Sequence, residues 1–225
     1  MSRLSKPHPS AEEHKQPPSY MTYEEFLEWA DEDTLAEWVD GAIIMPSPVS
    51  LRHQDITNFL FSLLSAFGDI YSLGKVINGP FQMKLAHVGR EPDLLYVTSE
   101  HLGRFKPTYL DGPADLVVEV VSPESASRDR GEKFYEYQEA GIPEYWLIDP
   151  RFQQAEFYQL DTEGRYQHTA PDVEGVYRSH VLPGFWLRVA WLWQEPLPNP
   201  IQALLAIDRD AYVRYFQEHL RQAES

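Results

Sequence analysis

Apolar residues recur at three- and four-residue steps after Ser50, in the clearest periodic pattern of the chain. The row consists of Ile56, Phe59, Leu60, Leu63, Leu64 and Phe67. This spacing places all of them on one face of a helix, and Gly68 is expected to end that helix. Two further helices are predicted at 128–140, which Gly141 follows, and at 201–222.

Short runs rich in β-branched and aromatic residues predict the strands. The run at 116–121 is almost continuously apolar, which is typical of a central strand covered on both faces. A helix at 128–140 and a strand at 145–148 follow it, so the pattern indicates an α/β fold with a mixed sheet. Additional strands are expected at 74–78, 81–87 and 93–97.

Turn residues separate the remaining elements. Asp40-Gly41 lies between two apolar runs and predicts a β-hairpin that carries Glu37. Beyond residue 150, strand patterns alternate with turn signals, which indicates an antiparallel β meander that extends the sheet. The prolines at 196, 198 and 200 predict a break before the last helix.

The two ends of the chain differ from its middle in composition. Residues 1–20 are polar, rich in proline and without periodicity, which is typical of a disordered leader. Thr22 and Glu25 have the spacing of a capping box, so order is expected to begin there. The interpretation is a leader at 1–20, one domain at 21–195 and a C-terminal helical extension at 196–225.

The chain contains no cysteine, which excludes disulfides, a thiolate zinc site and a cysteine nucleophile. The first twenty residues have no apolar core of the kind that a signal peptide needs. No later run approaches the ~20 apolar residues of a membrane span. We therefore expect a cytoplasmic protein that does not contact a membrane.

The chain is strongly acidic, with 19 Lys+Arg, 35 Asp+Glu and a net charge of −16. Such a charge repels a phosphate backbone and disfavours simple nucleic-acid binding. Eight of the acids lie within residues 21–40, where there is no base. Because charges are screened over about 8 Å at physiological ionic strength, an acidic segment on a distant face need not control the field at a separate cleft.

A single carboxylate interrupts the apolar run at 116–121. Burying Glu119 without a partner costs several kcal/mol unless it is protonated, paired or bound to a metal. Asp93 begins the strand predicted at 93–97, and two acids at the ends of neighbouring strands can converge on one divalent ion. Mg²⁺ prefers hard oxygen ligands and takes only one or two carboxylates. The alternative is a paired core carboxylate and an aspartate that caps a strand.

Several blocks in fixed order resemble the Uma family of bacterial proteins described as restriction endonucleases, within the PD-(D/E)XK nuclease superfamily. The resemblance covers residues 21–193. The blocks are Glu37-Trp38-Val39-Asp40-Gly41, His53, Glu91-Pro92-Asp93, Val118-Glu119-Val120-Val121-Ser122-Pro123, Asp129 with Lys133 and Tyr137, and Gly141-Ile142-Pro143-Glu144-Tyr145-Trp146-Leu147-Ile148-Asp149-Pro150. The fold that the resemblance implies is a restriction-endonuclease-like core with flanking helices.

The resemblance also implies the site. Its metal-binding positions are Asp93, Glu119 and Val120, and its catalytic residues are Asp93, Glu119, Lys133, Glu37 and His53. The superfamily pattern has a lysine two residues after the second acid, where this chain has Val121, so Lys133 on the following helix is the expected substitute. The implied cofactor is Mg²⁺, with Mn²⁺ as a replacement and no organic cofactor.

Each of these assignments has a simpler alternative. His53 fits a satisfied core histidine, and Glu37 fits a cross-strand ion pair. Lys133 fits a solvated helix lysine, and Asp129 is more often a helix cap or a partner of the helix dipole than a catalyst.

Two functions follow from these assignments. The first is a Mg²⁺-dependent endonuclease that hydrolyses phosphodiester bonds of DNA, as a homodimer because duplex cutting requires two sites. The second is a nuclease-derived binding or regulatory module, associated with mobile elements, whose site holds metal weakly or not at all.

Overall fold

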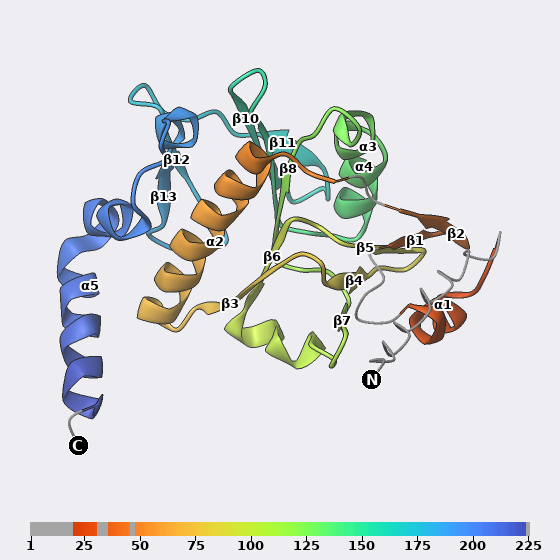
Figure 1. The fold of residues 1–225 in the computed structure, drawn as a ribbon, viewed down its shortest axis with the longest axis horizontal. Helices are drawn as coiled ribbons and strands as arrows, with labels where there is room; N and C mark the ends of the chain where they lie inside the picture. The colour runs from red at the N-terminus through yellow and green to blue at the C-terminus, as the bar shows by residue number, and fades with distance from the viewer. Residues whose placement is uncertain (1–19, 31–35, 46–47, 224–225) are drawn as a thin grey trace, which may run out of the picture.

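A computed structural model of the chain describes residues 20–30, 36–45 and 48–223. Its centre is a six-stranded sheet in the order β11-β10-β9-β8-β6-β3 (Figure 1). The strands are β3 (Gly74–Asn78), β6 (Leu94–Thr98), β8 (Leu116–Val120), β9 (Glu144–Asp149), β10 (Gln154–Leu160) and β11 (Tyr166–His168). β8 and β9 are parallel and every other neighbouring pair is antiparallel. The predicted α/β fold with a mixed sheet is confirmed.

Helices cover both faces of this sheet. α2 (Leu51–Tyr71) packs on one face, and α3 (Ala126–Arg130) and α4 (Glu132–Glu139) lie on the other (Figure 1). Successive residues of β8 point to opposite faces. Val118 and Val120 therefore join the core under α2, whereas Val117 and Val121 join the core under α4. Glu119 shares the α4 face, so its carboxylate is directed toward that helix.

α2 confirms the predicted amphipathic helix, but it does not end at Gly68. The helix continues to Tyr71, and Ser72 ends it in the left-handed conformation with φ 53°. Gly68 lies where α2 crosses β3, and a Cβ there would be 3.6 Å from the Gly74 carbonyl oxygen. That is an ordinary van der Waals distance, so Gly68 does not end the helix and packing does not require a glycine there.

The single helix predicted at 128–140 is also corrected. Gly131 has φ −116° and ψ −94°, which are not helical values, and it separates α3 from α4. α3 starts two residues earlier than predicted. The break directs the side chains of α3 and α4 separately toward the sheet.

A second sheet, in the order β2-β1-β5-β4-β7, flanks the first. Its strands are β1 (Glu37–Val39), β2 (Ala42–Ile44), β4 (Gln82–Lys84), β5 (Val88–Arg90) and β7 (Tyr109–Asp111). The predicted hairpin is confirmed, with Asp40 and Gly41 at φ 46° and 89° in its turn. The strand predicted at 81–87 is present but shorter, as β4, because the chain turns back after Lys84 and pairs β4 with β5.

Only part of the predicted meander extends the central sheet. β10 and β11 do so, whereas β12 (Val176–Arg178) and β13 (Trp186–Arg188) form a separate two-stranded sheet. Glu144 connects the two, because its buried carboxylate accepts hydrogen bonds from the Tyr177 and Ser179 hydroxyls and from the His180 and Val181 backbone N–H groups. The fold in this region therefore depends on one charged residue of β9.

The elements at the two ends lie on the flanks. α1 (Tyr23–Trp29) begins with the predicted capping box between Thr22 and Glu25. The predicted leader falls on residues 1–19, which lie outside the described residues, and on Tyr20. Two short 3₁₀ helices, η1 (Ser99–Arg104) and η2 (Val189–Trp193), connect strands to neighbouring elements.

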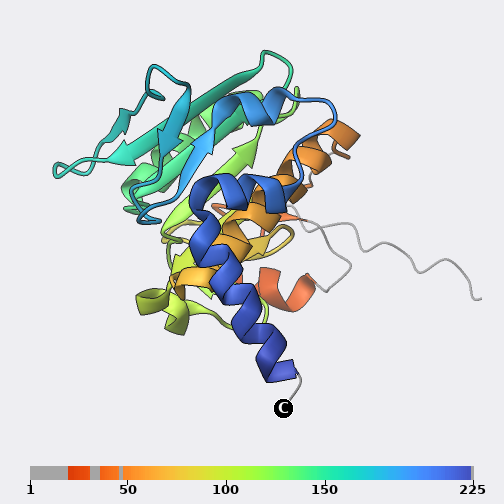
Figure 2. The same cartoon turned by 90° about the vertical axis from the view of Figure 1, so that its left-hand side faces the viewer.

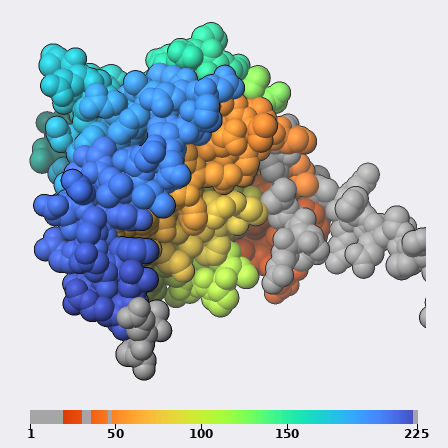
Figure 3. All heavy atoms as spheres, turned by 60° about the vertical axis from the view of Figure 1, so that its left-hand side comes forward, coloured from red at the N-terminus to blue at the C-terminus, as the bar shows by residue number. Residues whose placement is uncertain are grey.

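α5 (Pro200–Ala223) is the predicted C-terminal helix. It runs beside α2 and is interrupted at Asp208, which has φ −154° (Figure 2). The surface view shows α5 and α2 together on one side of the molecule (Figure 3). No described helix is long and apolar enough to cross a membrane.

Candidate active site

Asp93 and Glu119 face each other across the boundary between β6 and β8. Leu94 pairs with Val118 in the antiparallel register, and its continuation by one position sets Asp93 opposite Glu119. The Val120 backbone N–H donates to Asp93 Oδ2 at 2.7 Å. The register of the sheet therefore brings Asp93 and Glu119 together, as predicted for two acids at the ends of neighbouring strands.

Glu119 is almost fully enclosed, with its side chain 5% exposed. Its Oε1 accepts hydrogen bonds from Lys133 Nζ and from the Tyr137 hydroxyl, both at 2.9 Å. Burial raises the pKa of Glu119 to about 8, although the charge of Lys133 lowers it. The Glu119 carboxyl group is therefore harder to ionise than an ordinary glutamate until a further cation arrives.

Lys133 occupies the centre of the site instead of pointing into solvent. Its Nζ lies 2.9 Å from Glu119, 3.3 Å from Glu37 and 3.6 Å from Asp129. Burial alone would lower the pKa of Lys133, but these three carboxylates outweigh burial and raise it well above its ordinary value. These contacts favour the charged form of the amine, which suits a fixed positive charge better than a proton acceptor.

The predicted alternative for Glu37, a cross-strand ion pair, is also present. Arg90 lies opposite Glu37 in the β1–β5 pairing and donates to its Oε2 at 3.0 Å. The pKa of Glu37 is raised by burial, but Lys133 and Arg90 outweigh this and lower it. Glu37 is thus an ionised carboxylate shared between two buried cations.

Arg90 is a central residue that sequence analysis missed. It is fully buried and makes a bidentate pair with Glu136 of α4, with both distances at 2.8 Å. The available signal was an arginine in a run of strand residues directly before Glu91-Pro92. Arg90 joins β5 to α4 and thereby holds the second sheet against the site.

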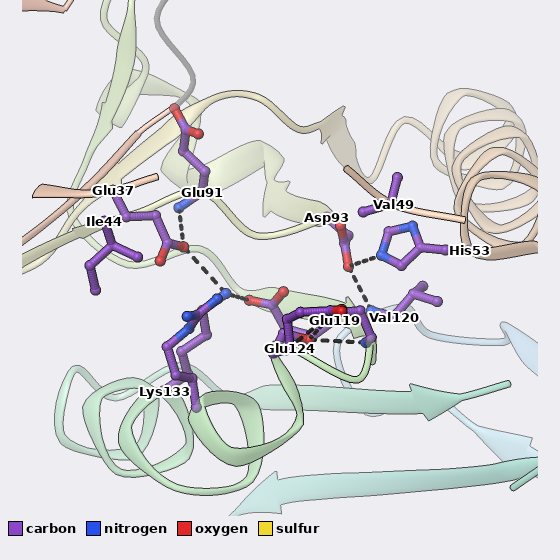
Figure 4. A pocket seen from close by; sticks show the side chains of 13 residues that line it. Glu37, Ile44, Val49, His53, Glu91, Asp93, Glu119, Val120, Glu124 and Lys133 are labelled. Carbon is purple, nitrogen blue, oxygen red and sulfur yellow. Dashed lines mark hydrogen bonds and ion pairs between the residues drawn. The ribbon is translucent and has the colours of Figure 1, made fainter. Parts of the chain in front are cut away.

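His53, in the first turn of α2, approaches Asp93 from the opposite side. His53 Nε2 lies 3.2 Å from Asp93 Oδ2, and Nδ1 is buried without a hydrogen-bond partner. Figure 4 shows His53 and Asp93 on one side of the cleft and Lys133 with Glu37 on the other. The structure thus gives His53 a contact with one of the two acids instead of enclosing it among apolar side chains alone.

These residues line one cavity of about 100 Å³, which has room for an ion and a few waters. Its wall contains the carboxylates of Glu37, Glu91, Asp93, Glu119 and Glu124. Burial, assisted by the charge of Glu37, raises the pKa of Glu91 to about 7. The cavity therefore has an excess of acid that a divalent cation would relieve.

The donor atoms fit a magnesium-type ion. Among the described residues, Asp93 Oδ1 and Glu119 Oε2 accept no hydrogen bond, while the other oxygen of each is occupied. In the described part of the chain, no group of three or more acids or histidines forms a ready-made metal cage. Mg²⁺ suits such a site, because it keeps several waters and binds through one or two carboxylates and substrate phosphates. The Val120 side chain offers no ligand.

The fold is that of a nuclease-type protein. The family model described as "Putative restriction endonuclease" (Uma2) matches residues 23–190, and the chain belongs to this family. No curated protein matches the chain. A solved structure from Anabaena variabilis ATCC 29413, titled a "putative nuclease belonging to DUF820", is similar in fold, with a TM-score of 0.65 and 17% identity. The match covers 77% of this chain and 97% of that one.

The structure brings all predicted site residues to one cavity: Asp93, Glu119, Lys133, Glu37, His53 and Val120. Their catalytic and metal-binding roles stay predictions. Asp129 is buried beside Lys133, and neither carboxylate oxygen has a hydrogen-bond partner. It is therefore a charge partner of the lysine and not a helix cap, and it lies in the first turn of α3, as the predicted alternative of a dipole partner requires.

Proposed function

We propose that this protein is a Mg²⁺-dependent endonuclease that hydrolyses phosphodiester bonds of DNA. The observation that carries the proposal is the meeting of Asp93, Glu119 and Lys133 in one cavity, with one oxygen of each acid unbonded among the described residues. Membership of the Uma2 family supports a nuclease. Mn²⁺ is expected to replace Mg²⁺.

The residues of the site have separable roles in this reaction. A bound divalent ion would neutralise charge that grows on the phosphate and lower the pKa of a bound water. Asp93 and Glu119 would hold the ion, while Lys133 and Tyr137 fix the orientation of Glu119 through Oε1. His53 and the Val120 N–H fix Asp93 in the same way. Such pre-arranged charges stabilise a transition state because they need no reorganisation when the reaction occurs.

The alternative is a nuclease-fold binding or regulatory module. It is favoured by the net charge of −16 and by the close pairing of Lys133 with three carboxylates. A cleavage assay separates the two functions. We expect Mg²⁺- or Mn²⁺-dependent cleavage of plasmid, linear, single-stranded or RNA substrates at low salt, and none by Asp93→Ala. Equal activity of the two proteins, or no cleavage of any substrate by the wild type, would support the module.

Metal binding should depend on pH, because Glu119 must lose its proton to bind an ion. Because its pKa is raised from 4.5 to about 8, Glu119 binds more proton in the folded apo protein than in the unfolded chain between these two pH values. This contribution to stability is complete below pH 4.5 and is lost as pH rises through about 8.

Mg²⁺ should therefore raise the melting temperature more at pH 8 than at pH 6. The apparent affinity should rise by up to about tenfold per pH unit below the pKa. Thermal unfolding over a range of Mg²⁺ concentrations at both pH values measures this. Glu119→Gln should remove the dependence, and an equal metal effect at both pH values would contradict it.

A homodimer is part of the proposal, since one cavity per chain cuts one strand. Light scattering after gel filtration is expected to give twice the chain mass of 26.1 kDa. A monomer that still cuts both strands of a duplex would contradict this.

A further inference from the structure

Three consecutive residues of α3 extend in different directions and have different partners. Asp129 is buried beside Lys133, at 3.6 Å. Arg130 pairs with Asp149 and Glu156 on β9 and β10. Arg128 lines the cavity that contains Asp93 and Glu119. Of these two arginines, Arg128 is therefore the one that faces the candidate active site.

Arg128 differs from the other cations of this region in having no ion-pair partner among the described residues. Lys133 is committed to Glu119, Glu37 and Asp129, and Arg90 is committed to Glu37 and Glu136. Arg128 is half-buried, and its Nε is enclosed without a hydrogen-bond partner. A guanidinium N–H that is removed from water in this way is costly until an acceptor reaches it.

The acids of the cavity do not supply this acceptor. Glu91 and Glu124 line the same cavity, yet neither makes an ion pair with Arg128 within the described residues. Among the described residues, the Arg128 Nε therefore has no acceptor, and an anion that enters the cavity would supply one. Arginine suits a phosphate group, because its planar donors match two phosphate oxygens at once.

We propose that Arg128 binds a backbone phosphate of the nucleic-acid substrate and positions it over Asp93 and Glu119. This assignment rests on the proposed nuclease function. It gives the cavity a positive charge that is free for the substrate, whereas the charge of Lys133 is neutralised by its three acids. An anion can then approach an acidic cavity through a bound cation and Arg128 together.

The test measures binding of fluorescein-labelled 20-nucleotide DNA and RNA by anisotropy, with Ca²⁺ in place of Mg²⁺ and intact probe verified on gels. Arg128→Met should weaken binding roughly tenfold to a hundredfold, as expected for loss of a charge-assisted hydrogen bond. The slope of log K against log salt should fall by about 0.7 for single strands and about 0.9 for duplex DNA. Arg128→Lys should retain the salt slope and show intermediate affinity. It keeps the positive charge but loses the paired planar N–H donors that match two phosphate oxygens.

The matched control is Arg178→Met, which removes an exposed arginine of β12 that does not line the cavity. It should leave both affinity and slope unchanged. The Mg²⁺-induced rise in melting temperature should be the same in Arg128→Met as in the wild type, which separates substrate binding from metal binding.

Three results would overturn the assignment. If the wild type binds the probes and Arg128→Met binds them with equal affinity and slope, Arg128 has no phosphate contact, while the nuclease proposal stands. If Arg128→Met loses the metal effect or its fold, the residue is structural. If the wild type binds neither probe in the presence of metal, both this assignment and the proposed function fail.

Discussion

Lys133→Met is expected to abolish cleavage and to lower the free energy of unfolding by about 3–5 kcal/mol, the usual cost of removing one partner of a buried ion pair. The side chain is 6% exposed and is the shared cation of Glu119, Glu37 and Asp129. Its loss leaves three acids around an apolar methionine. A lysine that was predicted to be catalytic thus also has a structural role, which its burial reveals.

Two measurements separate these roles of Lys133. Chemical denaturation gives the stability of the variant, and Lys106→Met is the control because Lys106 is exposed. The double variant Lys133→Met with Glu119→Gln should recover part of the lost stability, since it removes one uncompensated acid, but it should recover no cleavage. Unchanged stability in Lys133→Met would contradict the ion-pair cluster, and retained cleavage would contradict a catalytic role.

Asp93→Asn should reduce cleavage by roughly 10²–10³-fold or more, the range seen when one group that stabilises transition-state charge is removed. Its effect on the free energy of unfolding should be small, within about 1 kcal/mol. An amide oxygen can still accept the Val120 N–H, and only the contact with His53 Nε2 is altered. The rise in melting temperature with Mg²⁺ should disappear, because an amide is a weaker ligand than a carboxylate.

Glu124→Gln is the matched control for Asp93→Asn. Glu124 lines the same cavity but is exposed, and no described residue forms an ion pair with it. It should retain cleavage and the response to Mg²⁺. If both variants lose the metal response equally, the ion is held by the general negative field of the cavity and not by Asp93.

The cluster around Lys133 also explains how one cavity can hold so many acids. Arg90 and Lys133 neutralise Glu37, and Lys133 compensates Glu119 and Asp129 in part. Glu119 keeps a raised pKa despite this compensation. A site that is incompletely neutralised by its own residues is suited to attract a divalent ion, because the ion completes the charge balance.

Sequence alone determined the features that depend on neighbours in the chain. The apolar face of α2, the Asp40-Gly41 turn and the capping box of α1 each depend only on local residue spacing and local backbone preference. The apolar run around Glu119 likewise identified a central strand, since a strand covered on both faces has few polar residues. Together with the family resemblance, these patterns identified six residues that line the cavity in the structure: Glu37, His53, Asp93, Glu119, Val120 and Lys133.

Only the tertiary structure decided which charges meet. Arg90 reaches Glu37 through strand pairing and Glu136 through packing of α4, contacts that span 53 and 46 residues and leave no periodic signal. The break at Gly131 and the turn between β4 and β5 likewise became apparent only in the structure. Arg128 and Arg130 are two residues apart in sequence, yet one lines the cavity and the other pairs with β9 and β10, because α3 turns them to different sides. The partners of a charged side chain are set by distances between distant segments, and those distances exist only once the chain has folded.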